Sequence, residues 1–296
     1  YEAYPRQMRQ NDRHGTMSSS KSFIAAAIGN LVESGKINTA DSIEKYIPDV
    51  GEGYTGETVQ DALDMNVAIQ WSEEYSDPKA EGIEIFKAEA MHPGYDAWKG
   101  GARDFLRGLK KGGTPIDGNT HYYTSNTSVL GWVITNVTGL PWNRYAQKAI
   151  WEKIGAEQNA LNFEDATGYG QSSGSFVMTL RDFARFAQIF SGEGVAGNGN
   201  RIFSKKWFNT IVNNPNSTKY YHGATKSNWW YSHQLVINKK GGMGHLGYGG
   251  QFWYANHKTG VVIVKMSTLD NFAAADKDTL MATMNIVEII DDVISK

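Results

Sequence analysis

The stretch from Met17 to Ile28 reads MSSSKSFIAAAI, and it decides the fold of this 296-residue chain. A serine-rich step leads directly into a run of phenylalanine, isoleucine and alanine. Such a run favours a helix, which we expect over residues 23–32, and Gly35 is a natural end for it. The small side chains indicate a helix that is buried on most sides. Ser18 and Lys21 stand three residues apart at its start.

Ser18 and Lys21 together predict a nucleophile and its activator. On a helix, residues i and i+3 share a face, so the lysine amine lies beside the serine hydroxyl. A helix start stabilises negative charge, and a buried lysine can lose its proton and act as a base. The same Ser-x-x-Lys spacing recurs at residues 42–45 and 76–79. The first recurrence lies in a polar connector and Pro78 interrupts the second, so we place the nucleophile at Ser18.

Composition restricts the classes of function. The formal net charge is −2, from 29 Lys and Arg against 31 Asp and Glu, so neither a nucleic acid nor an anionic membrane is a favoured partner. The absence of cysteine excludes disulfides, thiolate catalysis and cysteine-ligated zinc. No apolar run approaches the ~20 residues that a membrane span requires. Histidines and acidic residues lack the spacing of metal ligands, so we expect no metal and no cofactor.

The remaining sequence predicts a mixture of helices and antiparallel strands. Helices are expected over residues 57–65, 128–137, 142–154, 179–190 and 279–294. Short β-branched or aromatic runs separated by turns predict adjacent antiparallel strands at 229–238, 251–255 and 261–267. Residues 68–118 are rich in glycine and proline, and a long irregular region in a compact domain is usually functional, for instance as a lobe that covers a substrate.

These elements indicate an α/β (α+β) fold with two lobes and a site between them. We expect residues 1–50 and 170–296 to form a sheet lobe. Residues 51–169 then form a helical and irregular lobe that contacts the substrate.

Three separated motifs carry a resemblance to a known family. The first comprises residues 18–23, followed by LVESGKI at 31–37 and YIP at 46–48. The second is YYTSNTSVLGW at 122–132, and the third is HLG at 245–247. In this order they resemble the serine β-lactamase-like hydrolases, and most closely the 6-aminohexanoate-dimer hydrolase group and the family VIII carboxylesterases.

The resemblance implies a β-lactamase/DD-peptidase-like fold, in which helices flank an antiparallel sheet and an all-helical lobe stands beside it. Members of the family carry a substantial segment before the nucleophile that supplies the first strands and a helix of the main sheet. Seventeen residues precede Ser18 here. We therefore expect the family's N-terminal segment to be lacking and a sheet edge to be exposed.

The second motif supplies a tyrosine that shares the role of general base with Lys21. We assign this role to Tyr123, by its distance from the Leu-Gly pair at 130–131, and keep Tyr122 as the alternative. Ser125 and Asn126, which follow in the motif, are expected to contact the substrate.

The third motif of β-lactamases is Lys-Thr-Gly on a strand that faces the nucleophile. The literal triplet at 258–260 falls between two predicted strands, so we interpret it as an exposed hairpin turn. His245 and Gly247 form the better counterpart, and both are expected to line the substrate site. By the resemblance, the backbone N–H groups of Ser18 and Tyr248 form an oxyanion hole.

The implied activity is hydrolysis of a small-molecule ester or linear amide through an acyl-enzyme on Ser18. Tyr75, in the irregular lobe, is a further expected substrate contact. An alternative within the same chemistry is an amide hydrolase of 6-aminohexanoate oligomers. An alternative of another class is a non-catalytic, penicillin-binding-like module. True β-lactamase or peptidase activity is disfavoured because His245 stands where a lysine is usual and Ser125 occupies the asparagine position of the second motif.

Two properties stay open in the sequence. The chain starts at Tyr1 without an initiator methionine or a signal peptide, so the compartment is undetermined between cytoplasm and periplasm. The oligomeric state is expected to be a monomer or a homodimer.

Overall fold

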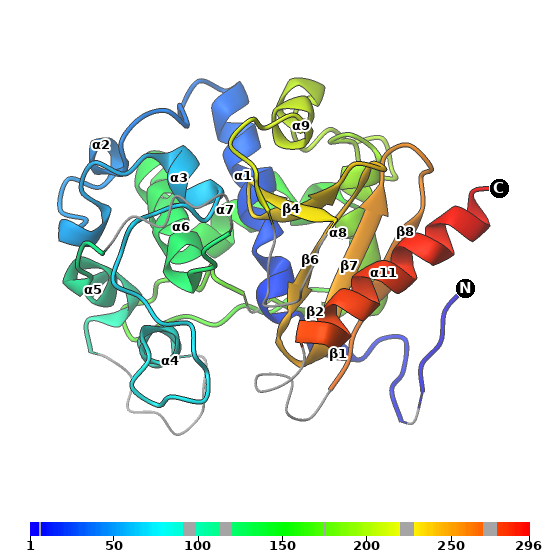
Figure 1. Ribbon diagram of the computed structural model, residues 1–296, viewed down its shortest axis with the longest axis horizontal. Coiled ribbons are helices and arrows are strands. Elements are labelled where there is room, and N and C mark those ends of the chain that lie inside the picture. Colours follow the sequence, from blue (N-terminus) through cyan, green and yellow to red (C-terminus); the bar gives the residue numbers. More distant parts are fainter. Residues whose placement is uncertain (6, 91–98, 113–119, 175, 220–227, 269–276) are drawn as a thin grey trace.

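In a computed structural model, residues 1–5, 7–90, 99–112, 120–174, 176–219, 228–268 and 277–296 are described (Figure 1). An antiparallel sheet lies on one side of the molecule, and the helices α2 to α6 lie on the other side. Helix α1 runs between these two regions.

The main sheet has six strands in the order β3-β4-β5-β6-β7-β8, and every neighbouring pair is antiparallel. Its strands are β3 (Thr218–Lys219), β4 (Trp229–Ser232), β5 (Leu235–Asn238), β6 (Gly242–Gly247), β7 (Gln251–Asn256) and β8 (Val262–Lys265). In the centre of the sheet, His245 on β6 is registered with Trp253 on β7. A separate pair joins β1 (Arg13–Gly15) to β2 (Val177–Thr179).

Helices and short helical turns are the other regular elements of the described chain. The α-helices are α1 (Ser22–Glu33), α2 (Ile43–Tyr46), α3 (Val59–Leu63), α4 (Glu81–Ala88), α5 (Gly101–Gly108), α6 (Thr124–Thr138), α7 (Trp142–Ala149), α8 (Leu180–Ser191), α9 (Lys205–Val212) and α11 (Lys277–Ile294). Short 3-10 turns are η1 (Met17–Ser20), η2 (Glu52–Tyr54), η3 (Trp151–Lys153) and η4 (Tyr248–Gly250).

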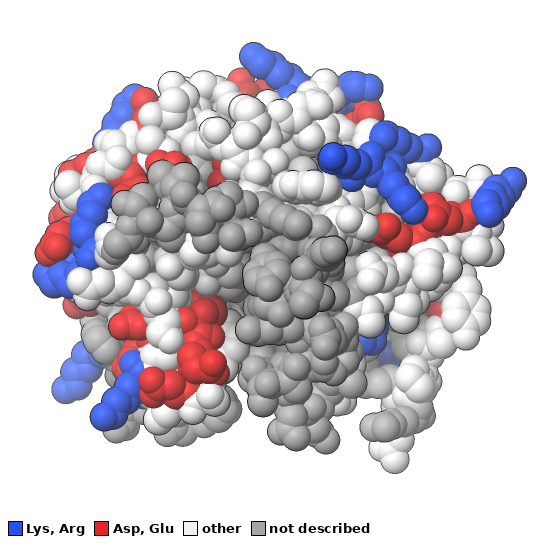
Figure 2. All heavy atoms as spheres, in the orientation of Figure 1, with Lys and Arg blue, Asp and Glu red and all other residues white. Residues whose placement is uncertain are grey.

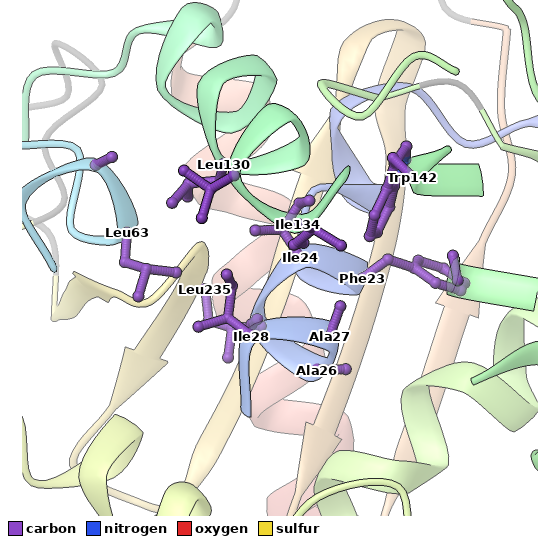
Figure 3. Packing of buried hydrophobic residues seen from close by; sticks show 14 of the residues in the cluster. Phe23, Ile24, Ala26, Ala27, Ile28, Leu63, Leu130, Ile134, Trp142 and Leu235 are labelled. Atoms are coloured by element: carbon purple, nitrogen blue, oxygen red, sulfur yellow. The ribbon is translucent and has the colours of Figure 1, made fainter. Parts of the chain in front are cut away.

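Helix α1 is the centre of the main core, as its alanine-rich sequence predicts. Residues 22–29 are all buried, and Gly35 follows the helix in the left-handed conformation, with φ of +69°. Figure 3 shows Ile24 and Ile28 packed among Ile134 of α6 and Leu235 of β5. Small side chains let neighbouring elements approach this closely.

The two faces of the sheet pack against different helices, because successive side chains on a strand point to opposite faces. On one face, Met243 and Trp253 join the core that surrounds α1 and α8. On the other face, Leu246 and Tyr254 join a second cluster with Met284 of α11. Figure 1 shows α11 lying across this second face.

Two predictions of secondary structure require correction. The predicted strand over 229–238 is two strands, β4 and β5, joined by a turn at His233 and Gln234. The predicted irregular region over 68–118 contains helices α4 and α5, while 91–98 and 113–118 lie outside the described residues. The predicted runs at 251–255 and 261–267 are confirmed as β7 and β8.

Candidate active site

The nucleophile turn is the 3-10 turn η1, which precedes α1. Ser18 is partly exposed on this turn, and the N–H of Lys21 donates to the Ser18 carbonyl at 2.9 Å. The indole Nε1 of Trp253 donates to the Ser19 carbonyl at 3.0 Å, which fixes the turn on the sheet. Met17 has φ of +48°, a left-handed conformation that is uncommon outside glycine. Such strain is frequently found at functional sites.

Lys21 lies behind this turn and is completely buried. Its Nζ donates to the carbonyl oxygen of Ser173 and lies 3.5 Å from Oγ1 of Thr124. The same Nζ lies 5.4 Å from the centroid of the Tyr122 ring. The lysine therefore points into a closed space formed by the loop before α8, the start of α6 and an aromatic ring.

Burial lowers the pKa of Lys21 to about 8, and the nearby carboxylates of Glu73 and Glu89 limit this decrease. Desolvation disfavours the charged form of an amine, and negative neighbours favour it. A lysine with a pKa near 8 exists in part as the free amine close to neutral pH, so it can accept a proton.

The tyrosine that faces Lys21 is Tyr122, the alternative in the sequence analysis, and not Tyr123. The ring of Tyr122 lies 6.2 Å from that of His245 and 6.3 Å from that of Tyr231, both within the sheet. The ring of Tyr123 instead lies 6.0 Å from Trp71 and is half-buried. Burial, together with Glu73, raises the pKa of Tyr123.

Backbone direction explains this difference. Tyr123 precedes the first residue of α6 in an extended conformation, with φ of −124° and ψ of +115°. Neighbouring side chains on extended backbone point in opposite directions. The two tyrosines therefore face different surroundings, and counting back from the Leu-Gly pair at 130–131 cannot distinguish them.

The same one-residue offset affects the polar residues that follow. Thr124, rather than Ser125, has its hydroxyl near Lys21. Asn126 is completely buried, where its Oδ1 accepts from the Tyr54 hydroxyl at 3.2 Å and its Nδ2 donates to Sδ of Met65 at 3.6 Å. Ser125 is also completely buried. This geometry does not support Ser125 and Asn126 as substrate contacts.

Strand β6 brings His245 and Gly247 to the nucleophile turn. A Cβ at Gly247 would lie 2.5 Å from the Thr16 carbonyl and 3.1 Å from Cβ of Met17, so only glycine permits this approach. Tyr248 follows at the start of η4 and is 46% exposed, which leaves its ring at the surface beside the turn.

His245 is neutral. Burial lowers its pKa to about 3, despite a hydrogen bond with the Leu246 carbonyl that opposes the decrease. Its Nδ1 lies 2.7 Å from that carbonyl, which can only accept, so Nδ1 carries the proton. Nε2 is then an acceptor, and it lies 3.4 Å from the Tyr231 hydroxyl.

Tyr75 and Glu73 form another side of the candidate site. The hydroxyl of Tyr75 donates to Oε1 of Glu73 at 2.6 Å, and its ring meets that of Tyr248 edge-on at 6.0 Å. Burial and the Glu73 charge raise the pKa of Tyr75 well above its usual range. Glu73 also accepts from the N–H of Thr124 at 3.1 Å, at the positive end of α6. The structure thus brings Tyr75 and Tyr248 together, and Glu73 links Tyr75 to Thr124, whose hydroxyl lies 3.5 Å from Nζ of Lys21.

Two buried or half-buried acids were not identified from the sequence. Glu73 and Glu89 both influence Lys21 electrostatically, and they come from the region that the sequence predicts to be irregular. No local pattern marks either residue, because their roles depend on the fold.

The competing motifs are exposed, unlike the buried Lys21. Lys45 is exposed and pairs with Asp41 at 2.7 Å, and Ser76 lies on an exposed loop where it bonds Glu74. The triplet at 258–260 is exposed and connects β7 to β8, which confirms that it is a hairpin turn.

Three further observations concern the molecule beyond this site. On the face that Figure 2 shows, basic and acidic side chains are interspersed. The described residues hold no group of three or more histidine, aspartate or glutamate side chains suited to a metal ion. Among the helices of this described part, none combines the length and apolarity that a bilayer crossing requires.

Comparison with known proteins defines the class. Residues 1–286 match the family described as Beta-lactamase. The chain therefore belongs to the beta-lactamase family, and it is a serine hydrolase with the fold expected from the three motifs.

Particular relatives agree with this placement. A 6-aminohexanoate-dimer hydrolase of Paenarthrobacter ureafaciens is 30% identical over 269 residues, which cover 87% of this chain and 67% of that protein. The structure of a putative 6-aminohexanoate-dimer hydrolase from Bacillus anthracis matches with a TM-score of 0.84 at 26% identity, over 99% of this chain and 76% of that one. A family VIII carboxylesterase shares the fold, with a TM-score of 0.67 at 16% identity over 95% of this chain and 84% of that one.

Proposed function

We propose that this protein hydrolyses carboxylic esters or linear amides through an acyl-enzyme on Ser18. The observation that carries the proposal is the completely buried Lys21, which follows the partly exposed Ser18 by three residues and has its Nζ 5.4 Å from the centroid of the Tyr122 ring. A buried amine with a pKa of about 8 beside a serine and a tyrosine is suited to activating a hydroxyl nucleophile.

In the acylation step, Oγ of Ser18 attacks the substrate carbonyl carbon while Lys21 and Tyr122 accept the serine proton. The carbonyl oxygen becomes an oxyanion, which the N–H groups of Ser18 and Tyr248 stabilise. The tetrahedral intermediate then collapses, the bond to the leaving group breaks, and Tyr122 protonates the departing alkoxide or amine.

In the deacylation step, water attacks the ester that links the acyl group to Ser18. Lys21 and Tyr122 take a proton from this water, a second tetrahedral intermediate forms, and Ser18 leaves with a proton returned to it. This step yields a carboxylic acid and the free enzyme, after the alcohol or amine has left in the first step. The two steps require no cofactor.

The neutral His245 favours substrates that carry no carboxylate at the position facing this residue. A lysine at this position of the third motif would offer a positive charge to a substrate carboxylate, whereas an uncharged imidazole offers only a hydrogen-bond acceptor. We propose that Tyr75 and Tyr248 contact the acyl group, and that the lobe of residues 51–169 shapes the pocket around it.

A second candidate is hydrolysis of 6-aminohexanoate oligomers. It is favoured by the 30% identity to a 6-aminohexanoate-dimer hydrolase over 87% of this chain. The chemistry at Ser18 would be the same, and the leaving group would be an amine.

Turnover of p-nitrophenyl acetate tests the proposal. Ser18→Ala should lower kcat by about a thousandfold or more, because it removes the nucleophile of a covalent mechanism. Ser76→Ala removes the serine of another Ser-x-x-Lys sequence and should retain the parent rate. Equal turnover in the parent and Ser18→Ala would refute the assignment, and comparison with a 6-aminohexanoate dimer would distinguish the two candidates.

A further inference from the structure

The segment of residues 171–174 lies directly against the nucleophile turn. The carbonyl oxygen of Ser173 accepts the hydrogen bond from Nζ of Lys21. Gly174, with φ of +138°, is so close that a Cβ there would lie 2.7 Å from the Met17 carbonyl oxygen and 2.8 Å from Cα of Ser18. All four residues of the segment are buried. A small displacement of this segment would therefore move the partner of the lysine.

Glu89, at the end of α4, accepts hydrogen bonds from two side chains of this segment. Its Oε2 accepts from the Ser173 hydroxyl at 2.6 Å and from Nε2 of Gln171 at 2.9 Å. Its Oε1 accepts from the Ser128 hydroxyl of α6 at 2.6 Å. The side chain is completely buried. One carboxylate thus connects α4, α6 and the segment that contacts Lys21.

The donors around Glu89 favour its ionised form. An ionised carboxylate only accepts hydrogen bonds, and Ser128, Ser173 and Gln171 can all donate to it. Burial raises the pKa of Glu89 above the ordinary value of a glutamate, and these three hydrogen bonds and the charge of Lys21 limit that increase. A carboxylate with three donors and a cation nearby has the partners that a buried charge requires.

We propose that Glu89 is a positioning residue for Lys21: it holds the Ser173 carbonyl against the lysine Nζ and provides a buried countercharge. This inference rests on the proposed function, in which Lys21 is part of the general base. Glu89 acts through Ser173 and through its electrostatic field.

Other titratable groups also face Lys21. Glu73 lies before α4, Tyr122 lies before α6, and His245 lies on β6. Glu73 contributes the second negative charge, whereas His245 is neutral. Removal of the Glu89 charge alone therefore leaves Glu73 in place and shifts the titration of Lys21 without abolishing it.

The pH dependence of kcat/KM for p-nitrophenyl acetate tests this role in Glu89→Gln. Loss of the negative charge lowers the pKa of Lys21, so the acid limb should move to lower pH by roughly one unit. The plateau should also fall by about tenfold, since the amide cannot accept from all three donors and the segment loses its fixed position. Glu33→Gln is the matched control, because it removes one charge from the exposed end of α1, and its profile should match the parent.

Ser173→Ala separates position from charge. It removes one hydrogen bond to the segment but keeps the Glu89 charge, so the plateau should fall while the acid limb stays within a few tenths of a unit of the parent. A Glu89→Gln protein without a cooperative thermal unfolding transition is not folded, and the test then rests on Ser173→Ala. A plateau of kcat/KM in Ser173→Ala equal to that of the parent would overturn the inference.

The outcomes also distinguish this inference from the proposed function. An unmoved or raised acid limb in folded Glu89→Gln, with Ser18 still required for turnover, would overturn the role of Glu89 alone. Full turnover in Ser18→Ala would instead overturn the proposed function on which the inference rests.

Discussion

At the scale of single residues, Tyr122 and Tyr123 are chemically identical neighbours that the backbone directs to different surroundings. Tyr122→Phe should lower kcat for ester hydrolysis by about a hundredfold, since it removes a hydroxyl that transfers protons. Tyr123→Phe should change kcat by less than about threefold, because its ring lies against Trp71 rather than Lys21. Steady-state kinetics of both variants check this assignment, and a larger loss in Tyr123→Phe would restore the assignment made from the sequence.

The ionisation of Lys21 gives a prediction for the pH profile. The lysine acts as a base only after it loses its proton, so kcat/KM should rise with pH and level off above a pKa of about 8. Lys21→Arg should abolish the rise together with most of the activity, because a guanidinium stays protonated. A parent profile that is flat from pH 6 to pH 9 would contradict the role of the lysine.

At the scale of elements, local sequence predicted α1 and the final strands well, because their periodicity and composition agree with their burial. The turn between β4 and β5 could not be predicted. His233 and Gln234 both have positive φ, of 52° and 62°, where glycine or asparagine is the usual signal. Contacts from α3 hold this turn: the N–H of Gln234 donates to the Leu63 carbonyl at 2.8 Å.

Asp64 is the side chain that most directly supports this turn. It is 2% exposed and accepts from the N–H of His233 at 2.9 Å and from Nδ2 of Asn214 at 2.9 Å. Asp64→Ala should lower the free energy of unfolding by about 2–4 kcal/mol, since it leaves buried donors without an acceptor. Urea denaturation measures the loss, and the exposed Asp49→Ala should cost less than about 1 kcal/mol. Equal costs would contradict the role of this turn.

At the scale of the whole molecule, the sequence predicted the fold class, whereas several residues around Lys21 could not be predicted from it. The three motifs predicted Ser18, Lys21 and the strand of His245 as parts of the site, because each is marked by neighbours in sequence. Glu73 and Glu89 lie more than fifty residues from Lys21 in sequence and reach it through tertiary contacts alone. The choice between Tyr122 and Tyr123 also depended on backbone direction, which spacing does not encode.

The attachment of α11 to the sheet gives a prediction at the same scale. Asp291 accepts from the Tyr254 hydroxyl and from Nδ2 of Asn256, both at 2.5 Å, and from the Thr259 hydroxyl at 2.6 Å. Asp291→Ala should lower the free energy of unfolding by about 2–4 kcal/mol, because this acid is buried with three donors. The neighbouring Asp292 is 54% exposed and pairs with Lys240, so Asp292→Ala should cost less than about 1 kcal/mol. Thermal or urea unfolding compares the two, and a reversed order would contradict this attachment.

Mass spectrometry of the trapped enzyme tests most directly whether Ser18 carries the acyl group. The protein is treated with a fluorophosphonate probe, digested and mapped. We expect one adduct, on Ser18, in the parent protein, and no adduct in Ser18→Ala or in protein that a substrate has already acylated. An adduct at another serine, or equal labelling of Ser18→Ala, would contradict this expectation.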